Sequence, residues 1–364
     1  MTLRRVQVTD FRCLLHAEFD LDPQFTLISG PNASGKTSLL EALYVLGRGR
    51  SFRTRRLETL IRSGVERFIV FGEVELAGGR IPMGIEGTAE GVRARIHGDR
   101  VSSLAELAAV LPVQIIDPEI HRLIEEGPSR RRQFLDWGVF HVEPQFVAHW
   151  QKYQQSLRQR NAALRAHQPQ GMVSAWDGEL IRYGELLSEA RRRYITRLEG
   201  EAQALCGSLL KLELTLGYRA GWPPNEGLGE ALARSWNQDQ EFGTTQVGPQ
   251  RAELTIRLAG IPVKDRISRG QQKLLAAALL ISQLKMFPSD APVRPTLLLD
   301  DPAAELDEER LGSLIQEVRA QTVQLVVTTL HGGFPAFGEP GRHYVLDSGT
   351  ARLVGAADRA GPAD

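Results

Sequence analysis

The chain has 364 residues, of which 44 are basic and 44 acidic, so its formal net charge at pH 7 is zero. This balance excludes a protein that binds nucleic acid over its whole surface, and any such contact must come from a local basic patch. No run of about twenty apolar residues occurs, so we expect no membrane-spanning helix. Two cysteines, Cys13 and Cys206, exclude a disulfide framework. The first ten residues have no apolar core of the kind that a secretory signal needs, so we expect a cytoplasmic location.

The first part of the chain is expected to consist mainly of strands, with one helix among them. Between residues 37 and 46 the apolar residues recur with the period of a helix. Three later strands alternate apolar and polar residues, so they should form antiparallel hairpins with one exposed face. The predicted strands cover residues 3–8, 17–21, 25–28, 68–76, 81–86, 92–97 and 110–116.

Residues 30–37 separate a predicted strand from the predicted helix, and they fit the pattern G-x-x-x-x-G-K-[ST] of a phosphate-binding loop. Its glycines let the backbone turn tightly and bring N–H groups to phosphate oxygens, beside the positive end of the helix dipole. Lys36 is expected to reach the β- and γ-phosphates, and the Thr37 hydroxyl is expected to bind Mg²⁺. The predicted ATP-binding residues are Gly30, Pro31, Asn32, Ala33, Ser34, Gly35, Lys36 and Thr37.

A short basic segment follows the predicted helix. In a chain of zero net charge it is a local basic patch, and two interpretations stay open. It is either an exposed loop or a contact with the phosphates of bound DNA, and beside an ATP site the same side chains could touch the nucleotide. The segment contains Arg48, Arg50, Arg53, Arg55 and Arg56.

The middle of the chain, from 119 to 209, has the apolar period of helices. A long helix from Phe146 to Leu164 is followed by a turn at 167–175 and by a second helix with apolar residues spaced three and four apart. This pattern predicts an antiparallel helical pair with arms of roughly 35 to 50 Å. We interpret Arg191, in a run of three arginines, as part of the polar face of the second helix.

The last third of the chain is expected to return to alternating strands and helices after a polar loop at 237–248. Strands are predicted at 212–216, 253–258, 261–264, 296–300 and 324–328, with a final hairpin in 344–354. Helices are predicted at 228–236, 270–286 and 307–319.

The apolar strand predicted at 296–300 ends in Asp300, and a second acid, Asp301, follows it directly. A P-loop ATPase needs a carboxylate at the end of a neighbouring strand to hold Mg²⁺ through water, and Asp300 suits that role. Asp301 is expected to face the γ-phosphate and to orient or deprotonate the attacking water. Turnover should be slow, because an aspartate side chain reaches less far than a glutamate.

Ser268, Arg269, Gly270 and Gln271 stand at the head of a predicted helix and resemble the signature motif of the ABC-type ATPases. In that superfamily the motif binds the γ-phosphate of ATP held by the other subunit, with backbone N–H groups and a hydroxyl at a helix N-terminus. His331 follows a predicted strand near the place where the superfamily has a switch residue, so it is a further catalytic candidate.

Further segments resemble the motifs of the RecF family, over most of the chain. The opening segment ends in Phe11-Arg12, and the resemblance implies that Arg12 belongs to the ATP-binding residues. The chain departs from the family pattern at Gln250, Glu253 and Ala304. The similar segments are Val8–Arg12, Pro118–Glu119, Gly127–Asp136, Leu157–Leu164, Gly248–Leu254 and Ser268–Gln271.

This resemblance implies an α/β fold, an ABC-type ATPase head in which a mixed sheet and antiparallel hairpins surround a P-loop core, with an inserted helical lobe. We expect an N-terminal ATPase part at 1–116, a helical lobe at 117–240 and a C-terminal ATPase part at 241–364.

The implied function is that of a slow, DNA-dependent ATPase of recombinational repair. It binds gapped, duplex and single-stranded DNA as an ATP-induced homodimer and, with RecR and RecO, helps RecA to load. The implied cofactors are ATP and Mg²⁺. Two alternatives remain open, an ATP motor subunit for a membrane partner and a P-loop ATPase joined to a nuclease.

Overall fold

The computed structural model describes residues 2–76, 79–263, 267–288, 291–302, 308–330 and 337–354. Contacts within the chain divide it into a first unit, residues 1–120 and 287–364, and a second unit, residues 121–286. Residues 241–286, which the sequence-based division assigns to the C-terminal ATPase part, therefore group with the helices of the second unit. His331, Ala304 and Asp307 lie outside the described residues.

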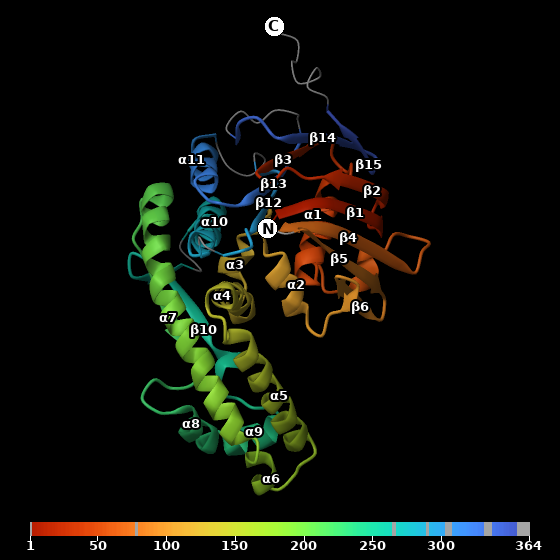
Figure 1. Cartoon of the computed structure of the whole chain (residues 1–364). Helices are drawn as coiled ribbons and strands as arrows, with labels where there is room; N and C mark the ends of the chain where they lie inside the picture. Colours follow the sequence, from red (N-terminus) through yellow and green to blue (C-terminus); the bar gives the residue numbers. More distant parts are fainter. Residues whose placement is uncertain are drawn as a thin grey trace. The chain divides into compact units, whose positions relative to one another are not determined.

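The first unit contains an antiparallel sheet in the order β2-β1-β4-β5-β6-β7 (Figure 1). Its strands alternate buried and exposed residues, as in β4, because one face lies on the core and the other faces solvent. The hairpins predicted from this alternation are confirmed. The strands are β1 (Thr2–Phe11), β2 (Leu14–Asp20), β4 (Arg67–Leu76), β5 (Gly79–Thr88), β6 (Gly91–Ile96) and β7 (Asp99–Arg100).

The second sheet of this unit has the order β15-β14-β3-β13-β12-β8, and all its pairs except β14–β15 are parallel. The central strands β3, β12 and β13 are buried at every residue, as expected for a sheet covered on both faces. The strands are β3 (Phe25–Ser29), β8 (Val113–Ile116), β12 (Thr296–Asp300), β13 (Gln324–Thr329), β14 (Arg342–Asp347) and β15 (Thr350–Leu353).

Helix α1 (Lys36–Arg48) lies between the two sheets of the first unit and joins their cores. Its apolar residues, Leu39, Leu43 and Leu46 among them, pack in one cluster with residues from both sheets. The remaining elements of the unit are η1 (Leu57–Leu60), α2 (Leu104–Val110) and α11 (Glu308–Arg319). The phosphate-loop segment is thus anchored in an apolar core to which both sheets of the unit contribute.

The second unit is built around the long helix α7 (Asp177–Leu210), and α5 (Phe146–Arg165) runs beside it in the opposite chain direction (Figure 1). This confirms the predicted helical pair; at 34 residues α7 spans about 51 Å. The three-stranded sheet β11-β10-β9 and helix α10 (Arg269–Lys285) belong to the same unit. Its other elements are α3 (Arg122–Glu125), α4 (Pro128–Val142), α6 (Gln170–Ser174), β9 (Leu214–Arg219), α8 (Leu228–Arg234), α9 (Trp236–Phe242), η2 (Pro249–Arg251), β10 (Glu253–Leu258) and β11 (Ile261–Pro262).

Three expectations need correction. The strand predicted at 110–116 is present as β8, but it begins only at Val113, because Val110 still belongs to α2. The first half of the polar stretch 237–248 belongs to helix α9, whose buried Asp239 accepts a hydrogen bond from the distant Arg160 side chain. Arg191 is not on the polar face of α7 but buried, with 3% of its surface exposed, because its guanidinium binds Asp136.

Candidate ATP site and arginine segment

The loop between β3 and α1 can be formed only with glycine at two positions. Gly30 has φ 156°, and a Cβ there would lie 2.1 Å from the carbonyl oxygen of Leu346. Gly35 has φ 106°, and a Cβ there would lie 2.9 Å from a methyl carbon of Leu14. The neighbouring β14 and β2 thus leave no room for side chains, and the loop backbone stays accessible to phosphate oxygens.

Lys36 folds back over this loop. Its Nζ donates to the carbonyl oxygens of Gly30, at 2.6 Å, and Pro31, at 2.8 Å. Burial lowers the pKa of Lys36, while the carboxylates of Asp301 and Asp300 raise it, so the cation and the two acids form one electrostatic group. The buried Oγ of Ser34 has no hydrogen-bond partner within the described part of the chain. An oxygen-rich anion in the loop would satisfy this hydroxyl, so the residues present fit a triphosphate.

The Thr37 hydroxyl and Asp300 come together through the strand order of the parallel sheet. The phosphate loop follows β3, and Asp300 ends β12. These two strands are not direct neighbours, because β13 lies between them. Thr37 Oγ1 donates to the Asp300 carboxylate at 2.9 Å, and Thr328 Oγ1, on β13, donates to it at 2.8 Å. Carboxylate and hydroxyl oxygens at the carboxyl ends of parallel strands fit a Mg²⁺ ion. Thr328 is a site residue that the sequence reading missed.

Asp301 follows Asp300 in a left-handed backbone conformation, with φ 45°. Its N–H donates to Thr328 Oγ1 at 3.2 Å, so β13 also fixes this residue. A left-handed non-glycine residue stores backbone strain, which commonly occurs at functional sites. Within the described ranges, no group of three or more His, Cys, Asp or Glu residues could hold a metal by itself.

Ser268 caps helix α10 of the second unit. Its Oγ accepts from the Gln271 N–H at 3.3 Å, and the Gln271 side chain accepts from the Ser268 N–H at 3.0 Å. This capping box fixes the first turn of α10. Ser268 and Arg269 are exposed, so the predicted signature motif presents a helix N-terminus to solvent.

Arg12 is bound to a residue that the sequence reading passed over. Its Nε and Nη2 donate to the two carboxylate oxygens of Glu41 at 2.9 and 2.8 Å, and its Nη1 donates to the Thr59 carbonyl at 2.8 Å. Glu41 is completely buried on α1. A single acid within the apolar run 39–46 is the sequence signal that could have found it.

The predicted arginine segment is exposed over most of its length. Arg50, Arg53, Arg55 and Arg56 are exposed, whereas Arg48 is half-buried with its guanidinium carbon 5.5 Å from the centre of the Tyr44 ring. The segment lies in the same unit as the phosphate loop, directly after α1. Four exposed guanidinium groups within seven residues can contact phosphates.

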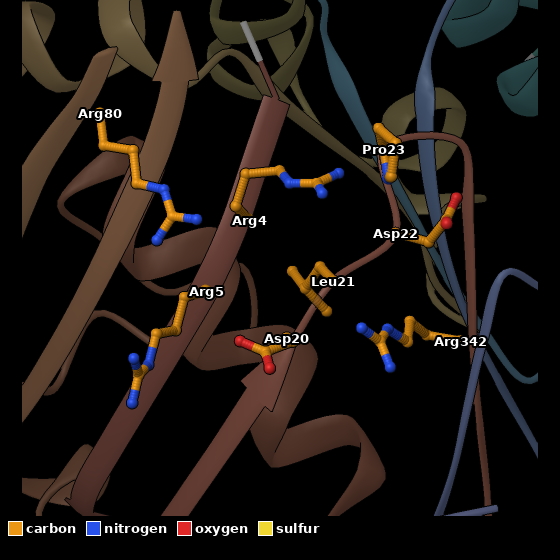
Figure 2. A pocket seen from close by; sticks show the side chains of 8 residues that line it. All are labelled: Arg4, Arg5, Asp20, Leu21, Asp22, Pro23, Arg80 and Arg342. Atoms are coloured by element: carbon orange, nitrogen blue, oxygen red, sulfur yellow. The ribbon is translucent and has the colours of Figure 1, made fainter. Parts of the chain in front are cut away.

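A pocket elsewhere on the first unit also contains arginines (Figure 2). Three of them already pair with acids: Arg4 with Glu75, Arg80 with Glu73 and Arg5 with Glu18. Two aspartates line the pocket as well, so its charges are largely balanced. We therefore assign the pocket no role in DNA binding. Its lining residues are Arg4, Arg5, Asp20, Leu21, Asp22, Pro23, Arg80 and Arg342.

Comparison with known proteins agrees with this geometry. The sequence model described as RecF/RecN/SMC N terminal domain matches residues 2–337. An Smc head bound to the C-winged helix domain of ScpA superposes with a TM-score of 0.57 at 16% identity, over 97% of this chain and 97% of that chain, which shows the fold alone. Fold and site together define a P-loop ATPase head of the ABC type. No helix in the described part of the chain is long and apolar enough to span a bilayer.

More similar proteins narrow the class. The DNA replication and repair protein RecF of Pseudomonas fluorescens is 45% identical over 329 residues, covering 88% of this chain and 89% of that protein. Its counterpart from Thioalkalivibrio sulfidiphilus is 41% identical over 333 residues, covering 91% and 92%. A solved structure of the recombination mediator protein RecF with ATP, in the RecFOR pathway, has a TM-score of 0.87 at 25% identity and covers 97% of this chain and 98% of that chain. The chain belongs to the RecF family of DNA replication and repair proteins.

Proposed function

We propose that this protein binds DNA in recombinational repair as a dimer that forms when two protomers share ATP. The observation that carries the proposal is the convergence of Lys36, Thr37 and Asp300 at one end of the parallel sheet. Solved ATP complexes of the recombination mediator RecF, which share the fold at 25 to 26% identity, support it.

Each protomer provides most of an ATP site. Lys36 holds the terminal phosphates, and Thr37 and Asp300 hold Mg²⁺, which when bound offsets the charge on the phosphate oxygens. Asp301, fixed through its N–H by Thr328, orients the attacking water. An aspartate is shorter than a glutamate, so we expect slow hydrolysis that serves to reset the protein.

The remaining groups come from a second copy of the chain. Ser268 and Gly270 at the exposed start of α10 offer a hydroxyl and N–H groups to the γ-phosphate of the other protomer. Because ATP contacts groups of both protomers in the dimer, it binds the dimer more tightly than one protomer and stabilises the dimer by mass action. Loss of the γ-phosphate removes the group that Ser268 contacts and releases the dimer.

DNA is held by the exposed arginines of the segment that follows α1. These side chains contact phosphates, and phosphate contacts position a protein without reading the sequence. We therefore propose binding to gapped and duplex DNA without sequence specificity. RecR and RecO are the proposed partners, and loading of RecA at single-strand gaps is the proposed outcome in the cytoplasm.

The test combines DNA affinity with salt dependence. Fluorescence anisotropy on duplex, single-stranded and gapped DNA, with and without a non-hydrolysable ATP analogue, should give tighter binding with nucleotide. The double variant Arg55→Ala/Arg56→Ala should lower the slope of log K against log salt by about two, since each lost phosphate contact contributes about 0.9. Arg93→Ala, an exposed arginine on β6 of the same unit, should leave the slope unchanged. Equal affinity with and without nucleotide would refute the proposal.

A further inference from the structure

One face of α1 connects the phosphate loop with the arginine segment. Thr37, Glu41, Tyr44 and Arg48 are spaced four, three and four residues apart, so they lie along one side of the helix. Thr37 binds Asp300 at the start of this face. Arg48, at its end, begins the arginine segment and lies over the Tyr44 ring. Glu41 stands between the two functional regions.

Glu41 is the centre of a cluster of polar contacts. Its carboxylate is fully buried and accepts both parallel hydrogen bonds of Arg12, at 2.8 and 2.9 Å. The same carboxylate accepts from Ser51 Oγ, and Arg53 Nη1 lies 3.8 Å from it. A buried carboxylate is stable only when it is paired and hydrogen-bonded, so these contacts must be kept together.

The contacts of Glu41 fix the arginine segment at both ends. At the start, Ser51 Oγ accepts from the N–H groups of Arg53, at 2.9 Å, and Thr54, at 3.0 Å. The ring of Phe52 packs edge-on against Tyr44 with 5.4 Å between the centres. At the far end, Arg12 holds η1 through the carbonyl groups of Thr59 and Leu60. A movement of α1 is therefore transmitted to the backbone that carries the exposed arginines.

We propose that Glu41 is a positioning residue that couples nucleotide binding to DNA binding. This inference rests on the proposed function and adds the route by which its two sites communicate. Glu41 touches neither ligand. Glu41 lies on α1, whose first turn carries Lys36 and Thr37, and it binds Arg12 and Ser51 from outside the helix. The arginine segment therefore keeps one position relative to that turn.

The test is a linkage cycle. DNA affinity is measured by anisotropy with and without a non-hydrolysable ATP analogue, and analogue affinity with and without duplex DNA. By thermodynamic linkage the two ratios must agree, and they give the coupling factor. Glu41→Gln keeps the shape of the side chain but removes its charge. It should lower the coupling factor by about fivefold or more, a typical size for such couplings, while DNA affinity without nucleotide stays within about twofold.

Two further variants keep the test decisive. Ser51→Ala removes the contact to the start of the segment at a half-buried loop position, and it should lower the coupling factor by a smaller amount. Glu58→Gln neutralises an exposed carboxylate in η1, next to the arginine segment, and should leave the factor unchanged. A residue with only a structural role would lower the melting temperature or both affinities without changing their ratio.

The possible results separate the two proposals. A wild-type coupling factor of one overturns both. A factor well above one in the wild type that stays the same in Glu41→Gln and Ser51→Ala overturns the role of Glu41 alone. A factor that falls in these two variants and not in Glu58→Gln supports it.

Discussion

The phosphate loop of the first unit and the helical pair of the second unit use charged residues in opposite ways. At the phosphate loop of the first unit, the polar groups are incompletely satisfied: Ser34 Oγ has no hydrogen-bond partner within the described part of the chain, and burial lowers the pKa of Lys36. In the second unit, the buried guanidinium groups of Arg160 and Arg191 are paired with carboxylates. The Arg160 motif therefore supports the second unit from within, whereas the phosphate loop is the proposed site of ligand binding.

The clearest example of internal support is Arg160 in the motif of α5. With 1% of its surface exposed, it donates to Asp177 at 2.7 Å, to Asp239 at 2.6 Å and to Thr245 at 2.9 Å. These hydrogen bonds tie α5 to the start of α7 and to α9. Such a network fixes the helical pair in one arrangement.

The motif residues around 130 and 250 behave similarly. Arg131 donates to Glu253 at 2.7 Å, and Arg132 donates to the Ala252 carbonyl at 2.7 Å. Gln250, where the family pattern has histidine, accepts from the Tyr153 hydroxyl. These contacts of Arg131 and Arg132 brace the second unit.

The largest expected change in stability concerns the hydrogen-bond network of Arg160. Arg160→Met should destabilise the protein by about 3 to 5 kcal/mol, since it leaves Asp239 buried without its counter-charge. Arg158→Met, at an exposed position of the same helix, should change the stability by less than about 0.5 kcal/mol. Urea unfolding followed by circular dichroism measures both. Equal stability of the two variants would refute the contrast between the units.

A smaller free-energy change is expected at the phosphate loop, but it should affect ligand binding. Lys36→Met should weaken ATP binding by about 1.5 to 3 kcal/mol, the usual contribution of a hydrogen bond to a charged group. It should also abolish ATP-driven dimerisation, while stability without nucleotide changes little. Calorimetric titration with ATP measures the change in affinity, and thermal unfolding without ATP measures the change in stability. A Lys36→Met protein that binds ATP as the wild type does would contradict the assigned role.

The smallest expected effect is a difference in chemical reactivity between the two thiols. Cys13 is exposed and lies 3.5 Å from Ser38 Oγ in α1, while Cys206 is buried in α7 and burial raises its pKa to about 12. Because the thiolate is the reactive form, iodoacetamide at pH 8 should label Cys13 and leave Cys206 unmodified in the folded protein. Bound nucleotide should slow the labelling of Cys13. Mass spectrometry of the labelled peptides would contradict this if Cys206 reacted at a similar rate.

Much of the first unit could be predicted because its signals are local. The phosphate loop is eight consecutive residues, and the strands that frame it are short apolar runs. Asp300 could be found because it ends such a run. Thr328 could not, since its role arises only when β13 pairs between β3 and β12. The order of strands in a parallel sheet cannot be predicted from any one segment of the sequence.

Two further errors concern Arg191 in the second unit and the run 110–116 in the first unit. Arg191 sits among three arginines and looks like a solvated residue, but Asp136, on α4, lies close enough in space to bind it at 2.8 Å. The run 110–116 is apolar enough for a strand, yet Ser103 and Glu106 form a capping box that starts a helix before it. A pairing between distant segments decided the case of Arg191, whereas a local capping signal decided where the strand after α2 begins.

The measurement that tests the account most directly is sedimentation velocity with a non-hydrolysable ATP analogue and Mg²⁺. The wild-type protein should shift from monomer to dimer, while Lys36→Met and Ser268→Arg should each remain monomeric, although Ser268→Arg still binds the nucleotide. A wild-type protein that binds the analogue and sediments as a monomer would contradict the shared ATP site.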